Sequence, residues 1–113
     1  MKIWVDDVRP APKGYVWCHS VLQTIRFIEM VERVKSVGES KSHNADDIVK
    51  WKIELIDIDH DAGDFAELGG DYIKILDWLE ETGRRYPIHI HSMNPVGIEN
   101  MRRIIRKNGW EEV

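Results

Sequence analysis

The chain of 113 residues is long enough for one hydrophobic core and too short for two, so we expect a single domain over residues 1–113. Hydrophobic residues make up 42% and charged residues 32%, which is typical of a soluble globular protein and argues against disorder. The formal net charge of -4 argues against duplex DNA as a partner, because phosphate contacts need clustered Lys and Arg, but it leaves room for a small phosphate ligand.

The sequence also bears on location. It has no apolar run long enough to cross a bilayer, and its start follows a strand pattern instead of a signal-peptide pattern. We therefore expect no membrane partner and a cytoplasmic location. The single cysteine, Cys18, has no partner for an intramolecular disulfide and is expected to be a small core residue.

The first half of the chain predicts two short strands and a helix. The strands cover residues 2–5 and 15–18, and a loop rich in Pro and Gly separates them. Apolar residues then recur at helical spacing over residues 20–34. A polar insertion follows over residues 35–52, in which we expect mobility and a short helix over 46–51.

The second half alternates strands and helices. Residues 53–58 form a nearly continuous apolar strand, which favours a parallel sheet covered on both faces. A helix over residues 71–83, a strand over 88–91 and a helix over 94–109 follow, with cap residues at the helix ends. Residues 110–113 are a candidate for a brief fifth strand.

This alternation predicts an α/β fold. Right-handed crossovers would build a three-layer, flavodoxin-like parallel sheet with strand order 2-1-3-4, with or without the short fifth strand. In such sheets ligands bind at the carboxyl ends of the strands. Acidic and imidazole side chains follow three of the expected strands, in the runs Asp6-Asp7, Asp59-His60-Asp61 and His91-Ser92.

These residues predict a cation and phosphate site. Clustered carboxylates suit Mg²⁺ or Mn²⁺, and carboxylates together with histidine would also suit Fe²⁺ or Zn²⁺. His60 or His91 could transfer a proton there. Ser92, Asn94 and the free N–H groups of the helix that begins at Pro95 favour an anion.

Structural explanations compete with these roles. The acidic pair could solvate the start of a loop, Asn94 could be only a helix cap, and Ser92 could bond to nearby backbone. His89 has the position of a sheet-buried histidine more than that of a ligand. Asp57 is an unexpected carboxylate inside the third strand, and it competes with Asp59 for the central position of the site.

Five stretches of the chain together resemble a known family. They are K-I-W-V-D-D-V-R-P, Y-V-W, D-H-D-A-G, G-x-D-Y and H-S-M-N-P-V-G-I-E-N-M. The pattern resembles the cyclic-phosphate processing receiver domains, a variant of the response-regulator receiver fold, and covers almost the whole chain apart from residues 35–52. The resemblance implies a receiver-like domain that acts on cyclic phosphates of nucleotides or RNA ends.

The resemblance implies roles for individual residues. Asp6 and Asp7 would be the acidic pair that holds a divalent cation, Asp59 the phospho-acceptor position and Ser92 the hydroxyl position of a receiver. The lysine that receivers carry at the end of their fifth strand is missing from residues 110–113. This departure argues against ordinary phosphorelay signalling.

The first hypothesis is a metal-assisted phosphoesterase, because opening a cyclic phosphate needs a base for water and an acid for the leaving oxygen. Its substrate would be a phosphate-bearing small molecule or an RNA end. The predicted site comprises metal ligands for Mg²⁺ or Mn²⁺ (Asp6, Asp7, Asp59, Asp61), an acid and a base (His60, His91) and phosphate-binding residues (Ser92, Asn94, Arg9).

Two alternatives stay open at this point. One is a non-catalytic signalling module that binds a phosphate ligand or is phosphorylated at Asp59. The other is an interaction domain whose acidic edge docks a basic partner.

Overall fold

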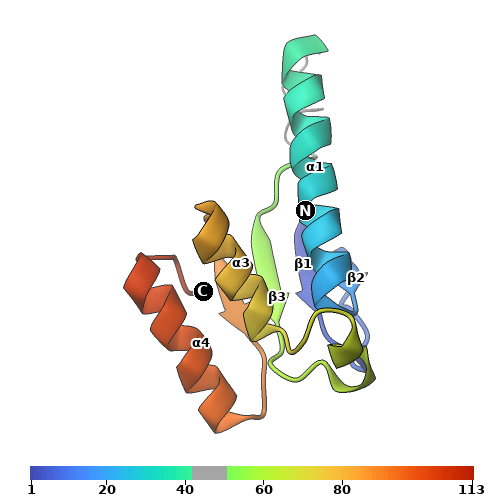
Figure 1. The fold of residues 1–113 in the computed structure, drawn as a ribbon. Coiled ribbons are helices and arrows are strands. Elements are labelled where there is room, and N and C mark those ends of the chain that lie inside the picture. The colour runs from blue at the N-terminus through green and yellow to red at the C-terminus, as the bar shows by residue number, and fades with distance from the viewer. Residues whose placement is uncertain (42–50) are drawn as a thin grey trace.

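The computed structural model describes residues 1–41 and 51–113, and within α1 it places side chains only up to residue 35. The sheet contains β1 (Lys2–Val5), β2 (Tyr15–Cys18), β3 (Leu55–Ile58) and β4 (Ile88–Ile90), all parallel, in the order β2-β1-β3-β4 (Figure 1). This confirms the predicted α/β fold and its strand order. The expected short helix over residues 46–51 lies almost wholly outside the described residues.

Three helices connect or follow these strands in the described part of the chain: α1 (Val21–Lys41), α3 (Ile73–Thr82) and α4 (Pro95–Asn108). A short 3-10 helix, η1 (Gly63–Glu67), lies between β3 and α3. Helix α1 extends beyond the predicted end near residue 34 and projects past the sheet (Figure 1). None of these helices is long and apolar enough to cross a membrane, within the described residues.

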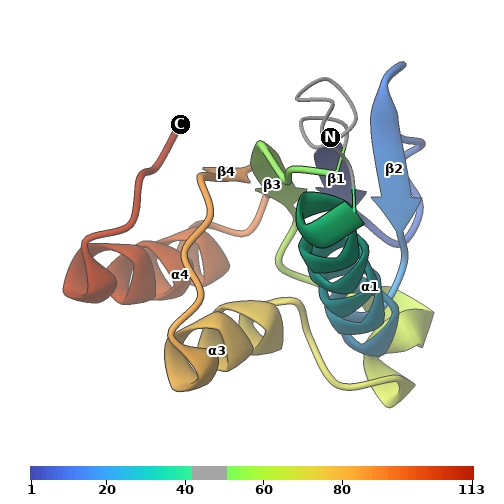
Figure 2. The ribbon, with the colours of Figure 1, turned by 90° about the horizontal axis from the view of Figure 1, so that it is seen from above.

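All the described α-helices lie on the same face of the sheet (Figure 2). The handedness of the connections explains this, because right-handed crossovers from β2 to β3 and from β3 to β4 pass over the same face. The connection from β1 to β2 runs the other way, so a helix there would cover the opposite face, but residues 6–14 form a loop without a helix. The described residues therefore form a sheet layer and one helix layer, where the sequence predicted three layers.

The core fills the space between the sheet and these helices. Alternate strand residues point into it, and Ile3, Val5, Ile56, Ile58 and Ile88 have 0% of their surface exposed. Because successive side chains of a strand point to opposite faces, the pattern fixes which residues face the helices. The helices contribute buried apolar residues, among them Ile28, Val31, Ile75, Leu76, Leu79, Met101 and Ile105, and Cys18 is buried as predicted.

The other sheet face carries a row of paired side chains. Trp4 lies opposite Trp17 on one side and Asp57 on the other, and Asp57 in turn lies opposite His89. His89 is exposed, so the prediction of a sheet-buried histidine is wrong; no described helix covers it, and its Nδ1 atom lies 2.7 Å from the carbonyl oxygen of Val113.

The predicted fifth strand is reduced to a single bridge. Glu112 pairs with Ile88 in parallel, and the backbone N–H of Val113 donates to the carbonyl of Ile88 at 2.8 Å. The end of α4 is held as the sequence predicts, with Gly109 in the left-handed conformation after Asn108. At the other end of α4, Asn94 is the N-cap and accepts a hydrogen bond from the backbone N–H of Gly97.

Candidate functional site

The loops after β1, β3 and β4 meet at the carboxyl edge of the sheet. Backbone hydrogen bonds continue the strand ladders one residue past each strand end: Asp59 donates to Val5 at 2.9 Å and His91 donates to Ile58 at 2.9 Å. These bonds fix where the first loop side chains start. The site residues therefore stand on the rigid sheet, as binding residues on a scaffold edge commonly do.

Asp6, Asp7 and Asp59 form an acidic cluster at this edge. Each contributes one oxygen to a group in which all the oxygens lie within 4.8 Å of one another, and among the described residues this group could hold a metal ion. Asp6 is 0% exposed and Asp59 only 8%. Three carboxylates from two adjacent strand ends are thus held together in a partly water-excluded position.

The backbone around Asp6 stabilises its charge. Its Oδ1 atom accepts hydrogen bonds from the backbone N–H groups of Val8 at 3.0 Å and Arg9 at 2.9 Å. Burial alone would raise the pKa of Asp6, but the Arg9 and Val8 bonds and the contact with His91 lower it below its ordinary value. Asp6 is therefore a carboxylate held ready in its charged form.

For Asp7 the effects that raise the pKa are the stronger ones. Burial, together with the neighbouring charges of Asp6 and Asp59, raises the pKa of Asp7 above its ordinary value. A Cβ atom on Gly63 would lie 2.4 Å from Oδ2 of Asp7, and Gly63 has φ of +54°, so only glycine suits this position. The absence of a side chain at Gly63 lets the backbone of η1 approach the carboxylate of Asp7 closely.

This donor set fits a hard divalent cation. Oxygen ligands from several carboxylates are the preferred partners of Mg²⁺ and Mn²⁺. A cation would also neutralise the mutual repulsion that raises the pKa of Asp7. No histidine nitrogen or thiolate belongs to the cluster within the described residues, which favours these metals over zinc.

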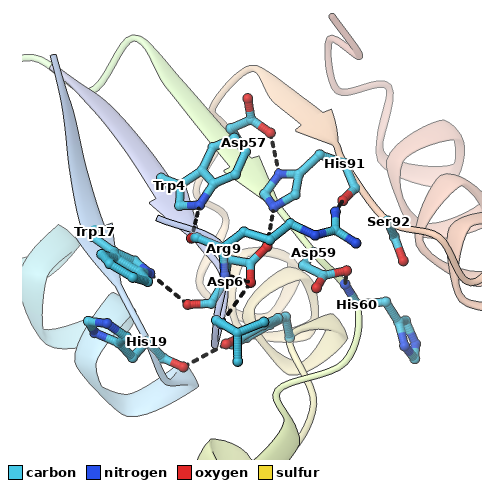
Figure 3. A network of polar contacts seen from close by, with 12 residues as sticks. Trp4, Asp6, Arg9, Trp17, His19, Asp57, Asp59, His60, His91 and Ser92 are labelled. Atoms are coloured by element: carbon cyan, nitrogen blue, oxygen red, sulfur yellow. Dashed lines mark hydrogen bonds and ion pairs between the residues drawn. The ribbon is translucent and has the colours of Figure 1, made fainter. Parts of the chain in front are cut away.

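His91 is held between two carboxylates on the edge of this cluster. Its Nδ1 atom lies 2.5 Å from Oδ1 of Asp57 and its Nε2 atom 2.9 Å from Oδ2 of Asp6 (Figure 3). The indole of Trp4 stacks on the imidazole, with ring centroids 3.8 Å apart and planes 4° from parallel. Burial lowers the pKa of His91, but Asp57 and Asp6 outweigh it and raise that pKa above its ordinary value.

These contacts settle the competition between Asp57 and Asp59. Asp57 lies within β3 and points to the face that carries Trp4, where it binds His91. Asp59 lies past the strand end and joins the acidic cluster. The two carboxylates therefore have different partners.

His60 and Asp61 form a second imidazole and carboxylate pair. The Nδ1 atom of His60 lies 2.8 Å from Oδ1 of Asp61, while Oδ2 of Asp61 accepts a 3.5 Å hydrogen bond from Asn94. The imidazole packs on the start of α4, since a Cβ atom on Gly97 would lie 2.5 Å from Cγ of His60. Asp61 was predicted as a metal ligand, but the acidic cluster does not include it and its oxygens contact His60 and Asn94.

The predicted phosphate-binding residues lie around the same edge. The hydroxyl of Ser92 accepts a hydrogen bond from the backbone N–H of Asn94 at 3.1 Å, and Asn94 caps α4. The guanidinium of Arg9 donates to the carbonyl oxygen of His91 at 3.1 Å, which brings it across Asp6 to the side of Ser92 (Figure 3). The N-terminus of α4, the Arg9 guanidinium and the Ser92 hydroxyl thus lie at the same edge of the sheet as the acidic cluster.

The sequence reasoning missed the aromatic residues that support these loops. Trp4 donates from Nε1 to the carbonyl oxygen of Arg9 at 2.8 Å, and Trp17 donates from Nε1 to that of Asp6, also at 2.8 Å. Their position could have indicated this role, since each tryptophan is the next-to-last residue of its strand, beside the loop that it supports. A cavity of about 580 Å³ lies at the opposite edge, near Glu54 and Pro87.

The fold and the site together define an α/β domain of the receiver class: a parallel sheet with order 2-1-3-4 and clustered acids at its carboxyl edge. A comparison with protein families matches residues 1–107 to the cyclic-phosphate processing receiver domain. The chain belongs to that family. No curated protein and no solved structure matches it.

Proposed function

We propose that this domain is a metal-assisted phosphoesterase that opens cyclic phosphates of nucleotides or RNA ends. The observation that carries the proposal is the cluster of Asp6, Asp7 and Asp59 at the sheet edge, with His60 following Asp59 in the chain and packing on the start of α4, in a domain of a cyclic-phosphate processing family. A cytoplasmic location is part of the same proposal.

The acidic cluster would hold Mg²⁺ or Mn²⁺. Such a cation, when bound, neutralises phosphate charge and polarises a phosphoryl oxygen. The guanidinium of Arg9, the hydroxyl of Ser92 and the N–H groups at the start of α4 would bind the remaining phosphate oxygens. These groups would orient the phosphorus atom toward His60.

His60 is the proposed proton-transfer residue. Asp61 bound to Nδ1 would keep the proton on that nitrogen and leave Nε2 free to accept one. Water attacks phosphorus and gives its proton to a base, one P–O bond of the ring breaks, and the leaving oxygen takes a proton. The product is an acyclic phosphomonoester, and Asp61 acts as a positioning residue.

His91 is better suited to positioning than to the predicted acid or base role. Both of its nitrogens already face carboxylates, and only 11% of its side chain is exposed. Held by Asp57 and stacked on Trp4, it would keep Oδ2 of Asp6 in place. Arg9 also depends on this arrangement, since its guanidinium binds the His91 backbone.

Incubating the protein with 2′,3′-cyclic nucleotides and either cation tests the proposal. We expect turnover that needs the cation and falls by about a hundredfold or more in His60→Gln. His91→Gln should mainly weaken cation binding, seen as a higher cation concentration for half-maximal rate. No turnover with either cation, or turnover unchanged in His60→Gln, would reject the mechanism.

A second candidate function is signalling by phosphorylation of Asp59. It is favoured by the placement of Asp59 next to the Asp6 and Asp7 carboxylates and by the hydrogen bond that its Oδ1 accepts from the His60 backbone at 2.7 Å. Incubation with a small phosphodonor such as acetyl phosphate tests it by intact mass. A stable adduct that Asp59→Asn removes, without turnover of cyclic phosphates, would favour signalling.

A further inference from the structure

We propose that the cavity between the start of α1 and η1 binds the nucleobase of a nucleotide whose phosphate lies at the acidic cluster. The cavity has a volume of about 330 Å³ and is lined by His19, Leu22, Gln23, Arg26, Phe65 and Leu68, together with Ser20. That volume is at the lower end of the range of small-molecule sites, on the order of 300–1,000 Å³. This inference rests on the proposed function and specifies its substrate as a base-containing phosphate.

Aromatic rings form one wall of the cavity. The imidazole of His19 stacks on the indole of Trp17, with centroids 4.4 Å apart, and is tilted against the phenyl ring of Phe65, with centroids 5.3 Å apart. Every nucleobase has a flat π face, so aromatic side chains of this kind bind bases with little regard to sequence. Gln23 and Arg26 add hydrogen-bond donors, which suit the edge of a base.

The same rings connect the cavity to the acidic cluster. Trp17 donates its indole N–H to the carbonyl of Asp6 at 2.8 Å (Figure 3), and the hydroxyl of Tyr72 donates to the carbonyl of His19 at 2.6 Å. These contacts link the rings of Trp17 and Tyr72 to the backbone of Asp6 and of His19.

Helix η1 provides a second connection. Its first residue, Gly63, is packed against the carboxylate of Asp7, and Phe65 of the same short helix lines the cavity. Two residues of chain span at most about 7 Å. The Cα atoms of Gly63 and Phe65 are therefore at most that far apart, and the proposed nucleotide would span the distance between the acidic cluster and Phe65.

The cavity wall is built by the fold. The backbone N–H of Leu22 donates to the carbonyl of Leu68 at 3.1 Å, which ties the loop after η1 to the start of α1. A Cβ atom on Gly69, which has φ of +111°, would lie 2.9 Å from Cβ of Val21, so this approach requires glycine. Leu22 is 41% and Leu68 49% exposed, and a bound base would cover these apolar side chains.

Binding of nucleoside monophosphates in the presence of Mg²⁺ tests the inference without requiring turnover. The probes are adenosine 3′-monophosphate, ribose 5-phosphate and inorganic phosphate, titrated against the full chain by calorimetry. We expect the base-containing ligand to bind at least about tenfold more tightly than ribose 5-phosphate. Equal affinities, or no binding of the nucleotide at all, would overturn the inference.

Two variants localise the base. Phe65→Leu keeps apolar volume and removes the ring, and Leu22→Ser removes a rim side chain; each should reduce the nucleotide preference by several-fold and leave inorganic phosphate binding unchanged. Met30→Ser is the matched control for Leu22→Ser, because Met30 is 44% exposed on α1 and does not line the cavity. Circular dichroism confirms that each variant is folded.

The two proposals can fail separately. Nucleotide preference that depends on Phe65, without hydrolysis of any cyclic phosphate, would reject the phosphoesterase and keep the base site. Hydrolysis at equal rates with cyclic nucleotides and with a base-free cyclic phosphate would keep the phosphoesterase and reject the base site. Equal loss of nucleotide and phosphate binding in Phe65→Leu would also reject it.

Discussion

The Nδ1 atom of His91 lies 2.5 Å from the Oδ1 atom of Asp57, on the sheet face that no described helix covers. The same imidazole reaches Asp6 on its other side and carries the indole of Trp4 on its ring face. Asp57 and His91 are both nearly buried, and an unpaired charge on either would destabilise the fold. The imidazole is instead paired with two carboxylates and stacked on Trp4.

Asp57→Asn is predicted to destabilise the protein, because it removes a carboxylate that is only 7% exposed and leaves the imidazolium with one charged partner. We expect a loss of about 1–3 kcal/mol in the free energy of unfolding. Urea denaturation followed by tryptophan fluorescence measures it. Asp64→Asn changes an exposed acid of η1 in the same way and should change stability by less than about 0.5 kcal/mol.

The stability of the cation-free protein should depend on pH through His91. Since folding raises the pKa of His91, the folded state retains the proton more strongly than the unfolded chain. This contribution is therefore fully present below pH 6.5, the ordinary pKa, and is lost as pH rises through the pKa of the folded state.

Unfolding measured with a chelator across neutral pH should show this decline, and His91→Gln should remove it. On the acid side the sign reverses, because the pKa of Asp6 is lowered below 3.8 and its contribution is lost as pH falls. A stability profile of the wild type that stays flat above pH 6.5 would show that the imidazole is not held by its two carboxylates in solution.

Binding of Mg²⁺ or Mn²⁺ should stabilise the folded state. At a cation concentration a hundredfold above its Kd, the gain is about 2.7 kcal/mol, which raises the melting temperature by several degrees. Asp7→Asn should behave in two opposite ways. Without a cation it should stabilise, because Asp6 and Asp59 repel the Asp7 charge; with a cation it should lose most of the gain.

Thermal melts with a chelator and with each cation measure both effects. Glu81→Gln is a suitable control, because Glu81 is an exposed acid on α3. If Asp7→Asn left the cation-induced shift intact, the acidic cluster would not be the binding site. If it failed to stabilise the chelated protein, the repulsion between these carboxylates would already be relieved by solvent.

Gly97→Ala should separate stability from activity. Alanine in place of glycine near the start of α4 favours the helix by up to about 1 kcal/mol, but its Cβ atom would displace the His60 ring. We expect a stability change within about 1 kcal/mol and a fall in kcat of about a hundredfold. Steady-state kinetics together with denaturation measures both quantities.

Val96→Ala is the matched control for that variant, since Val96 is 71% exposed on the same first turn of α4 and touches no predicted catalytic group in the described structure. It should leave kcat within about twofold. Full activity of Gly97→Ala would mean that the ring of His60 can move without consequence, which removes it from the proposed mechanism.

Much of the fold follows from local patterns that the sequence displays. Alternating strands and helices predict the parallel order 2-1-3-4, and the cap at Asn94 and the end at Gly109 follow from local backbone chemistry. The predicted end of α1 near Val34 was wrong, because the backbone helix continues to Lys41 through a stretch that is polar in sequence. The sequence predicted a second helix layer, which the described residues do not form, because the connection from β1 to β2 is a loop without a helix.

By itself, then, the sequence determined which edge of the sheet carries the chemistry, because the residues that follow each strand can be read locally and the carboxyl ends of parallel strands share one edge. Only the tertiary structure decided the partners: Asp57 binds His91, and Asp59 joins Asp6 and Asp7. The physical reason is separation along the chain. His91 contacts residues 34 and 85 positions away, and only the packed sheet register brings such side chains within hydrogen-bond distance.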